Sequence, residues 1–262
     1  MLFSLKFITK MLSIIIPAYN EEKRIGATLE AYGGFFIDKF FKETLHCEIL
    51  VIINNSTDKT LEIVKEYMKK YKNIGYLNLK PGGKGFALIE GFKIARGDYI
   101  GFVDADMSTY PEHFYDLYKN IGSYDGIIAS RWLENSITKR TFGKYIRSKG
   151  FNYLVRTLFL FPYKDTQCGA KIFKKENLMK IIPEMMSMKW AFDVNLLYLM
   201  KKNEYLVKEH PTLWVDKAGS KLSPKVPIQM AAGVIRLRLV YSPFNFLVRF
   251  YDLIPGKVKL HH

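Results

Sequence analysis

Runs of apolar, β-branched residues alternate with segments of helical periodicity along the first 105 residues of the chain. The pattern predicts strands over residues 12–17, 48–54, 76–79 and 99–103, and helices over 21–32, 57–71 and 85–95. Strands that are apolar on both faces and alternate with helices are typical of a mainly parallel, doubly wound α/β sheet. We therefore expect a Rossmann-like sheet, whose ligand crevice lies at the carboxyl ends of the strands.

A polar cluster follows each of three predicted strands. The clusters are PAYNEE (17–22), NNSTDKT (54–60) and DADMS (104–108). Because the carboxyl ends of parallel strands meet at one edge of a sheet, we expect the three clusters to surround one crevice.

The DADMS cluster places two carboxylates, Asp104 and Asp106, directly after a buried strand. Carboxylates at such a place are costly to desolvate unless they are paired, hydrogen-bonded or bound to a cation. Their oxygens suit Mg²⁺ or Mn²⁺, which would bridge to phosphate oxygens. A solvated turn closed by an Asx cap is the more common explanation of an isolated pair, so the motif alone is weak evidence for a metal site.

A glycine-rich turn precedes the helix predicted over 85–95. Gly82, Gly83 and Gly85 surround Lys84, and the helix carries small residues at Ala87 and Gly91 that allow close packing. Backbone amides and a lysine at a helix N-terminus bind anions. The segment matches neither the Walker pattern nor GxGxxG.

Composition indicates a globular protein with a sizeable core, since 48% of its 262 residues are hydrophobic. The two cysteines, Cys47 and Cys168, lie far apart without a zinc or disulfide pattern, which fits a reducing compartment. No signal peptide is recognisable, and no apolar run reaches the roughly 18 residues that span a bilayer.

The chain carries a formal net charge of +15, which favours an anionic partner. Residues 135–164 contain lysines and arginines but no Asp or Glu, and aromatic residues lie between the basic ones. A solvated cationic face is one explanation, but this mixture better suits the headgroups and tails of a membrane surface.

Two apolar helices are predicted near the C-terminus. One covers residues 228–241, and a second begins at Ser242-Pro243 and runs to 254 with a narrow polar stripe. Such helices can be part of a core, but beside a basic domain we expect them to lie in the plane of a membrane surface. This gives a catalytic domain over residues 11–222 and membrane-associating helices over 223–262.

Five segments together resemble the family 2, A-type glycosyltransferases that load sugars onto polyisoprenyl phosphates. They are IPAYNEEKRI (16–25), PGGKGFALIEGFKIARGDYIGFVDADMS (81–108), DTQCGAKIF (165–173), WAFDVNLLY (190–198) and GSKL (219–222). Within this family they are most similar to the dolichyl-phosphate β-glucosyltransferases, and more distantly to the dolichol-phosphate mannose synthases. The resemblance covers about residues 12–222.

The resemblance implies a nucleotide-sugar donor, UDP-glucose or GDP-mannose, whose nucleotide pocket is lined by Pro17, Tyr19 and Glu21. The family pattern DDGSTD reads Ile53, Asn54, Asn55 and Ser56 at its first four positions here, which is the clearest departure. Asn54 can still bind the base, because an amide offers both an acceptor and a donor.

The resemblance also assigns the metal and diphosphate site. Asp106 becomes the direct ligand of Mg²⁺ or Mn²⁺, and Asp104 lies near the ribose and the metal. Lys84, Ser220 and Lys221 lie beside the diphosphate, the last two on a loop that closes over the donor.

For the acceptor, the resemblance implies a polyisoprenyl phosphate held by Arg131, Arg147 and Ser148. Asp193 occupies the place of the base in relatives that act on hydroxyl acceptors, and we expect it here to orient the site or the sugar. An ionised phosphate needs little help from a base, so positioning and charge neutralisation dominate. In-line attack inverts the anomeric carbon and gives a β-linked lipid product.

Three interpretations remain. We favour an inverting hexosyltransferase, peripheral on the cytoplasmic face of a membrane, with Asp104, Asp106, Arg131 and Asp193 as catalytic residues. The second is a transferase to a hydroxyl acceptor, which the acid-free basic segment disfavours. The third is a non-catalytic binder of nucleotide sugars or of nucleic acid; nucleic-acid binding would not need Asp106, and we do not expect it.

Overall fold

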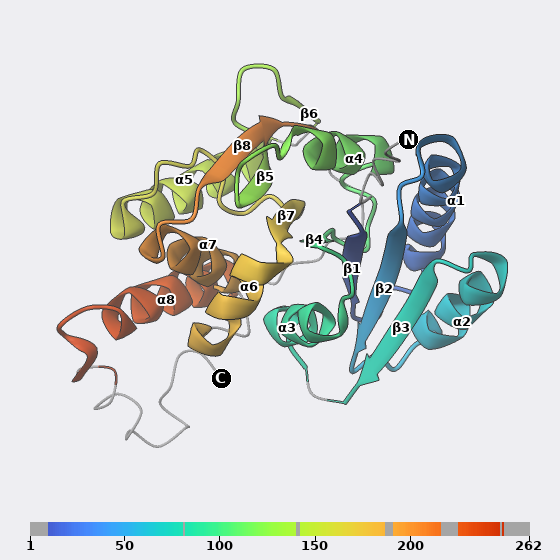
Figure 1. Cartoon of the computed structure of the whole chain (residues 1–262). Helices are drawn as coiled ribbons and strands as arrows, with labels where there is room; N and C mark the ends of the chain where they lie inside the picture. The colour runs from blue at the N-terminus through green and yellow to red at the C-terminus, as the bar shows by residue number, and fades with distance from the viewer. Residues whose placement is uncertain are drawn as a thin grey trace, which may run out of the picture.

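The computed structural model describes residues 10–80, 82–139, 142–186, 191–215, 225–246 and 248. A seven-stranded sheet has the strand order β3-β2-β1-β4-β7-β5-β8, and a second sheet pairs β6 with β9 (Figure 1). The strands are β1 (Leu12–Ala18), β2 (Cys47–Asn54), β3 (Ile74–Leu79), β4 (Tyr99–Phe102), β5 (Gly126–Ser130), β6 (Ile137–Lys139), β7 (Lys171–Lys174), β8 (Val207–Pro211) and β9 (Leu213–Val215).

Helices connect most of these strands. They are α1 (Ile25–Glu43), α2 (Thr60–Lys70), α3 (Lys84–Ile94), α4 (Pro111–Asn120), α5 (Phe142–Phe159), α6 (Lys175–Ile181), α7 (Phe192–Lys202) and α8 (Lys225–Val240), with the 3₁₀ turn η1 (Ile182–Glu184) after α6.

The sheet is doubly wound and mainly parallel, as the sequence predicts. Strand β1 pairs in parallel with β2 on one side and with β4 on the other, so the strand order reverses between β1 and β4. Strand β7 runs antiparallel to both of its neighbours, β4 and β5. A reversal of strand order opens a crevice at the carboxyl ends of the strands, and the three polar clusters follow β1, β2 and β4.

Two apolar layers cover the faces of the sheet. Ile14 and Ile16 of β1 point into the layer that includes α1, α2 and α4. Ile15, between them, points into the layer of α3, α5, α6, α7 and α8. Each layer is a continuous buried cluster, and successive residues of β1 serve opposite layers because side chains alternate across a strand.

The predicted boundaries of two helices are wrong at their starts. Helix α1 begins at Ile25 instead of residue 21, because the backbone of Asn20 takes a left-handed conformation (φ 51°) and the polar residues after it bind the loop beyond β2. Helix α2 begins at Thr60, whose N–H donates to Asp58 Oδ1 at 3.0 Å. In both cases polar side chains form contacts between loops in place of a first helical turn.

The C-terminal prediction is only partly within the described residues. Helix α8 matches the first predicted helix, and the N–H of Phe244 donates to Ser242 Oγ at 3.1 Å, which agrees with a helix start there. Residues 216–224, with the proposed domain boundary, and 249–262 lie outside the described residues. None of the helices in the described part of the chain combines the length and apolar character that crossing a bilayer requires.

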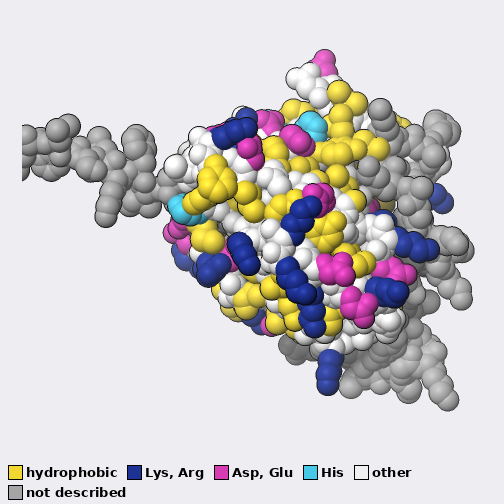
Figure 2. All heavy atoms as spheres, turned by 90° about the vertical axis from the view of Figure 1, so that its right-hand side faces the viewer, with side chains coloured by type: hydrophobic (Ala, Val, Ile, Leu, Met, Phe, Trp, Pro, Cys, Tyr) yellow, Lys and Arg dark blue, Asp and Glu magenta, His cyan; other side chains and the backbone are white. Residues whose placement is uncertain are grey.

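The face viewed in Figure 2 mixes charges of both signs with apolar side chains. On α1, Lys39 pairs with Glu43 at 2.5 Å, and Lys70 of α2 pairs with Glu30 at 2.6 Å. Some of the lysines of α1 and α2 are therefore paired with acidic side chains.

Close packing of α3 on the sheet requires Gly91. A Cβ atom at this position would lie 2.6 Å from Ile15 Cγ2 and 2.9 Å from Ile52 Cγ1. The small residue therefore sets the distance between α3 and the strands whose ends carry two of the polar clusters, as the sequence predicts.

Replacing Gly91 with alanine should lower the free energy of unfolding by about 1–3 kcal/mol, because the methyl group overpacks this contact. Thermal or urea unfolding measures the change. Gly143→Ala in α5 is the matched control: its Cβ would meet no described atom within 4 Å, so better helix propensity should leave stability equal or higher. Equal behaviour of the two variants would contradict the prediction.

Candidate active site

The loops after β1 and β2 are joined by reciprocal hydrogen bonds. The N–H of Asn20 donates to Ser56 Oγ at 3.0 Å, and Asn20 Oδ1 accepts from the N–H of Thr57 at 2.8 Å. The N–H of Glu22 donates to Asp58 Oδ2 at 3.0 Å. The first two polar clusters therefore form one wall of the crevice.

Arg24 links this wall to the cluster after β4. Its guanidinium forms a bidentate ion pair with Glu21, with its Nη2 2.5 Å from Oε1, and its Nη1 lies 3.9 Å from Asp106 Oδ2. Burial raises the pKa of Glu21, and the carboxylates of Asp106 and Asp104 raise it further against the effect of Arg24. The negative charges of Asp106 and Asp104 therefore reach Glu21, and Arg24 offsets part of their repulsion.

Asp104 lies between a lysine and a glycine. Lys84 Nζ donates to Asp104 Oδ1 at 2.6 Å, and a Cβ atom on Gly169 would lie 1.9 Å from Asp104 Oδ2. Burial would lower the pKa of Lys84, but the carboxylates of Asp104, Asp193 and Asp106 raise it above its ordinary value. Lys84 is the first residue of α3, and Gly83 before it has a φ of 131°, which favours glycine. The turn thus carries a firmly charged ammonium at a helix N-terminus, as predicted.

Asp106 closes a turn through one oxygen and keeps part of its side chain accessible. Its Oδ1 accepts the N–H of Ser108 at 3.0 Å, which closes an Asx turn, and its side chain remains 24% exposed. The described residues contain no group of three or more His, Cys, Asp or Glu side chains placed to hold a metal. Two carboxylates fit Mg²⁺ or Mn²⁺ all the same, because such ions take one or two carboxylates together with waters and substrate phosphates.

Asn54 ends β2 in a buried place. It is 4% exposed, and its Oδ1 has no hydrogen-bond partner among the described residues. An unsatisfied buried acceptor costs about 1–3 kcal/mol, so a ligand that donates to it gains affinity. Asn55 takes the left-handed φ of 54° at the glycine position of the family pattern, which asparagine tolerates. At the end of the neighbouring strand β1, Tyr19 is 59% exposed and Pro17 is half-buried.

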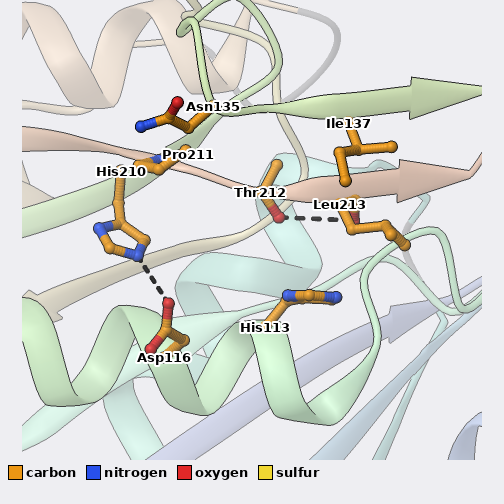
Figure 3. Close-up of a pocket in the computed structure, with 8 residues that line it drawn as sticks. All are labelled: His113, Asp116, Asn135, Ile137, His210, Pro211, Thr212 and Leu213. Carbon is orange, nitrogen blue, oxygen red and sulfur yellow. Dashed lines mark hydrogen bonds and ion pairs between the residues drawn. The ribbon is translucent and has the colours of Figure 1, made fainter.

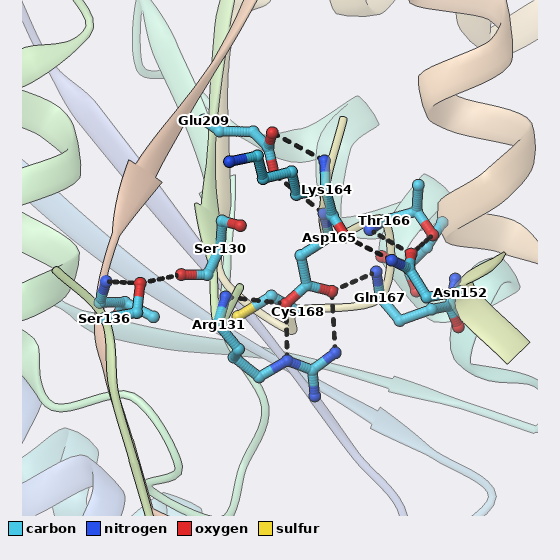
Figure 4. A network of polar contacts seen from close by, with 12 residues as sticks. Ser130, Arg131, Ser136, Asn152, Lys164, Asp165, Thr166, Gln167, Cys168 and Glu209 are labelled. Carbon is cyan, nitrogen blue, oxygen red and sulfur yellow. Dashed lines mark hydrogen bonds and ion pairs between the residues drawn. The ribbon is translucent and has the colours of Figure 1, made fainter. Parts of the chain in front are cut away.

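Arg131, directly after β5, is held in a buried ion pair (Figure 4). Its Nε donates to Asp165 Oδ2 at 2.7 Å, its Nη2 donates to Oδ1 at 2.9 Å, and its guanidinium lies 5.1 Å from the centre of the Trp214 ring. Burial would lower the pKa of Arg131, but Asp165 raises it, and Asp104 adds to that effect. The charge of Asp104 therefore reaches the guanidinium of Arg131.

The segment that carries Asp165 is fixed on both sides. Glu209 of β8 accepts the N–H groups of Lys164 and Asp165 at 2.7 and 2.9 Å, and Asn152 of α5 accepts the N–H of Thr166 at 3.2 Å (Figure 4). Asp165 was not assigned to the site by the sequence analysis, although the segment DTQCGAKIF, which begins with it, carries part of the family resemblance.

Asp193, in the first turn of α7, is paired with a residue that the sequence analysis missed. Lys171 Nζ donates to Asp193 Oδ1 at 2.6 Å, and the lysine side chain is fully buried. The local sequence KIFK does not indicate that Lys171 pairs with Asp193, because this contact depends on how the strands are ordered in the sheet.

For the other predicted ligands of the phosphate groups, the structure shows no direct contact with the site among the described residues. Arg147 and Ser148 lie on α5, where the nearby Tyr145 ring packs on Trp132 with the ring centroids 5.2 Å apart. This brings the first turns of α5 toward Arg131, although no contact of the described residues joins Arg147 to Arg131. Ser220 and Lys221 lie outside the described residues.

Comparison with known proteins agrees with this architecture. Residues 13–182 match the family model described as Glycosyl transferase family 2. The chain belongs to this family. Dolichyl-phosphate β-glucosyltransferase of Dictyostelium discoideum is 37% identical over 243 residues, 88% of this chain and 74% of that protein. The human dolichyl-phosphate β-glucosyltransferase is 30% identical over 247 residues, 89% of this chain and 76% of that protein. The protein is thus a glycosyltransferase, as the motifs indicate.

Solved structures show that this family 2 glycosyltransferase has the A-type fold. Glucosyl-3-phosphoglycerate synthase of Mycobacterium tuberculosis, in complex with Mn²⁺, UDP and glucosyl-3-phosphoglycerate, superposes with a TM-score of 0.66. It is 16% identical, and the match covers 88% of this chain and 79% of that one.

The glycosyltransferase has a second concavity that does not involve the strand-end clusters. A pocket of about 220 Å³ lies between α4 and the segment around β9, and His210 Nε2 lies 2.8 Å from Asp116 Oδ2 at its edge (Figure 3). None of the residues that line this pocket belongs to the crevice.

Replacing Asp165 with asparagine should lower the free energy of unfolding of the glycosyltransferase at pH 7 by about 3–5 kcal/mol, since a buried guanidinium loses its counter-charge. Burial would raise the pKa of Asp165, but Arg131 and backbone N–H groups hold it below the ordinary 3.8. Its contribution is therefore present above pH 3.8 and is lost as the pH falls through the lower folded value.

Urea unfolding at pH 7 and near pH 3 tests this, and the variant should lose this part of the acid dependence. Asp38→Asn is the control, because Asp38 is an exposed partner of Lys42 and should change stability by less than about 1 kcal/mol. An Asp165→Asn protein as stable as wild type would refute the prediction.

Proposed function

We propose that the enzyme transfers a hexose from a nucleotide diphosphate sugar, UDP-glucose, to a polyisoprenyl phosphate such as dolichyl phosphate, with inversion to a β-linked product. The observation that carries this proposal is the buried Arg131, whose guanidinium the charge of Asp104 reaches. An arginine has five N–H donors, and the pair with Asp165 uses two of the side chain's donors, which leaves others for a second anion. The names of the relatives, dolichyl-phosphate β-glucosyltransferases at 30–37% identity, support the choice of acceptor and sugar.

On the donor side, Asp104 and Asp106 would hold Mg²⁺ or Mn²⁺ together with the diphosphate. The ion neutralises charge on the diphosphate leaving group when it is bound. Lys84 and the N–H groups at the start of α3 bind the same phosphates. The mycobacterial structure with Mn²⁺ and UDP is a precedent on this fold for such a pairing of metal and nucleotide.

The nucleoside lies against the wall that the loops after β1 and β2 form together. Pro17, Tyr19 and Glu21 line it, and Asn54 Oδ1 accepts a hydrogen bond from the base. Ser220 and Lys221 remain predicted ligands of the diphosphate.

On the acceptor side, Arg131, Arg147 and Ser148 bind the lipid phosphate. A phosphate monoester is largely ionised at neutral pH, so its oxygen attacks the anomeric carbon as the bond from that carbon to the diphosphate breaks. Attack opposite the leaving group inverts the configuration. Positioning and charge neutralisation supply the rate enhancement.

The acceptor's lipid tail lies in a membrane, so the enzyme needs a surface that contacts the membrane. Helix α5 carries exposed apolar side chains that suit this contact. Ile146 and Tyr153 of α5 and Leu160, directly after the helix, are 52%, 72% and 75% exposed. Helix α8 packs beside it, with Arg238 Nε donating to the carbonyl of Leu158 at 2.8 Å, and adds Ile235, which is 46% exposed. Together with the basic residues of α5, these side chains suit peripheral attachment to the cytoplasmic face of a membrane.

Transfer of label to a polyprenyl phosphate in detergent tests the reaction, with UDP-glucose and GDP-mannose compared in the presence of Mg²⁺ or Mn²⁺. We expect metal-dependent product from UDP-glucose and a loss of about 100-fold or more in kcat/KM for Asp106→Ala, because a ligand of the leaving group's counter-ion is gone. Asp38→Ala, at an exposed site on α1, should retain activity. Product from GDP-mannose alone would overturn the choice of donor, and nucleotide binding without turnover would indicate a binding protein.

Flotation with vesicles of neutral and anionic phospholipid tests the membrane surface. The double variant Tyr153→Ser, Leu160→Ser should bind at least about tenfold more weakly, because each buried apolar side chain contributes about 1.5–3 kcal/mol. Phe41→Ser is the control, since Phe41 is 76% exposed but lies on α1. Equal loss in both proteins would argue against attachment through α5.

A further inference from the structure

Lys171 is a fully buried cation whose contacts converge on the crevice. Its Nζ donates to Asp193 Oδ1 and to the carbonyl oxygen of Cys168, both at 2.6 Å, and it lies 5.4 Å from the centre of the Phe102 ring. In the register of β7 with β4, Lys171 is opposite Phe102, two residues before Asp104. A buried ammonium is costly unless it is paired, so Asp193 and Lys171 depend on each other.

Asp193 occupies the sequence position at which relatives that act on hydroxyl acceptors carry their general base. It lies in the first turn of α7 with 8% exposure, and its charge acts on Lys84 across the crevice. Lys171 from β7 is its direct partner, the charge of Lys84 acts on it from a greater distance, and the N-terminus of α7 adds a further favourable field. Lys171 occupies Oδ1 of Asp193 and stabilises the negative charge of the carboxylate, which a proton would cancel.

This pairing matters for the choice of acceptor. Water or a sugar hydroxyl must lose a proton as its oxygen attacks the anomeric carbon, and a general base contributes 10²–10⁴-fold to such a step. An ionised phosphate has no proton to lose. Because Asp193 is paired with Lys171, the site therefore favours an ionised phosphate over water or a hydroxyl group as the acceptor.

We propose that Lys171 is a positioning residue that holds Asp193 in an ion pair and thereby makes the enzyme selective for acceptors that are already ionised. The proposal rests on the proposed transfer to a lipid phosphate and adds the reason why water and hydroxyl groups are rejected. Without the ammonium, Asp193 accepts the proton of a water whose oxygen bonds to the anomeric carbon while the bond to the diphosphate breaks. Free sugar and nucleoside diphosphate are then the products.

The test measures the ratio of donor hydrolysis to lipid-phosphate glycosylation, with UDP-glucose, polyprenyl phosphate and Mn²⁺, in wild type, Lys171→Met and the double variant Lys171→Met, Asp193→Asn. We expect the ratio to rise at least about tenfold in Lys171→Met and to return toward the wild-type value in the double variant. Lys171→Gln, which keeps a donor but removes the charge, is made in parallel with its own double variant, and thermal unfolding shows which pair is folded.

Each result decides the proposal. An unchanged ratio in the folded single variant would overturn it, and so would a rise that persists in the double variant, because water would then enter a loosened site without help from Asp193. Wild-type glycosylation of the lipid is measured first. Its absence would overturn the proposed function itself, whereas its presence with an unchanged ratio would overturn only the role of Lys171.

Discussion

The arrangement of the crevice depends on the contacts of the Asp104 carboxylate. It meets the ammonium of Lys84 on one side and the backbone of Gly169 on the other, so three segments that are distant in the sequence are held at the end of β4. A partly buried carboxylate demands such partners. The glycine is needed because a side chain there would occupy the place of the carboxylate, and the lysine is brought by the start of α3, whose close approach to the sheet requires Gly91.

Much of the first half of the chain follows from its sequence. The runs that end at Ala18, Asn54 and Phe102 are apolar on both faces, so their place in a parallel sheet and the meeting of their polar ends could be predicted. The start of α1 could not be predicted, because the side chain of Asn20 can either cap a helix or accept a hydrogen bond from Thr57. Which of the two forms depends on the position of the loop after the neighbouring strand.

The second half was predictable in its motifs but not in its contacts. Arg131 was identified as a phosphate ligand by resemblance, yet its partner Asp165 is 34 residues away in the chain and meets it through β5 and β7. The same holds for Lys171 and Asp193. Strand order is a property of the whole sheet, and no local pattern of residues records that β7 lies between β4 and β5.

Residues 165–171 connect the two halves of the site by a fixed length of chain. Asp165 holds Arg131, Gly169 bounds Asp104, and Lys171 holds Asp193, so this short segment sets the spacing between the groups assigned to the acceptor and those assigned to the donor. Successive strand residues face opposite sides of a sheet. Insertion or deletion of one residue here would turn Lys171 away from α7, and the length of this connection is therefore constrained together with the residue types at 165, 169 and 171.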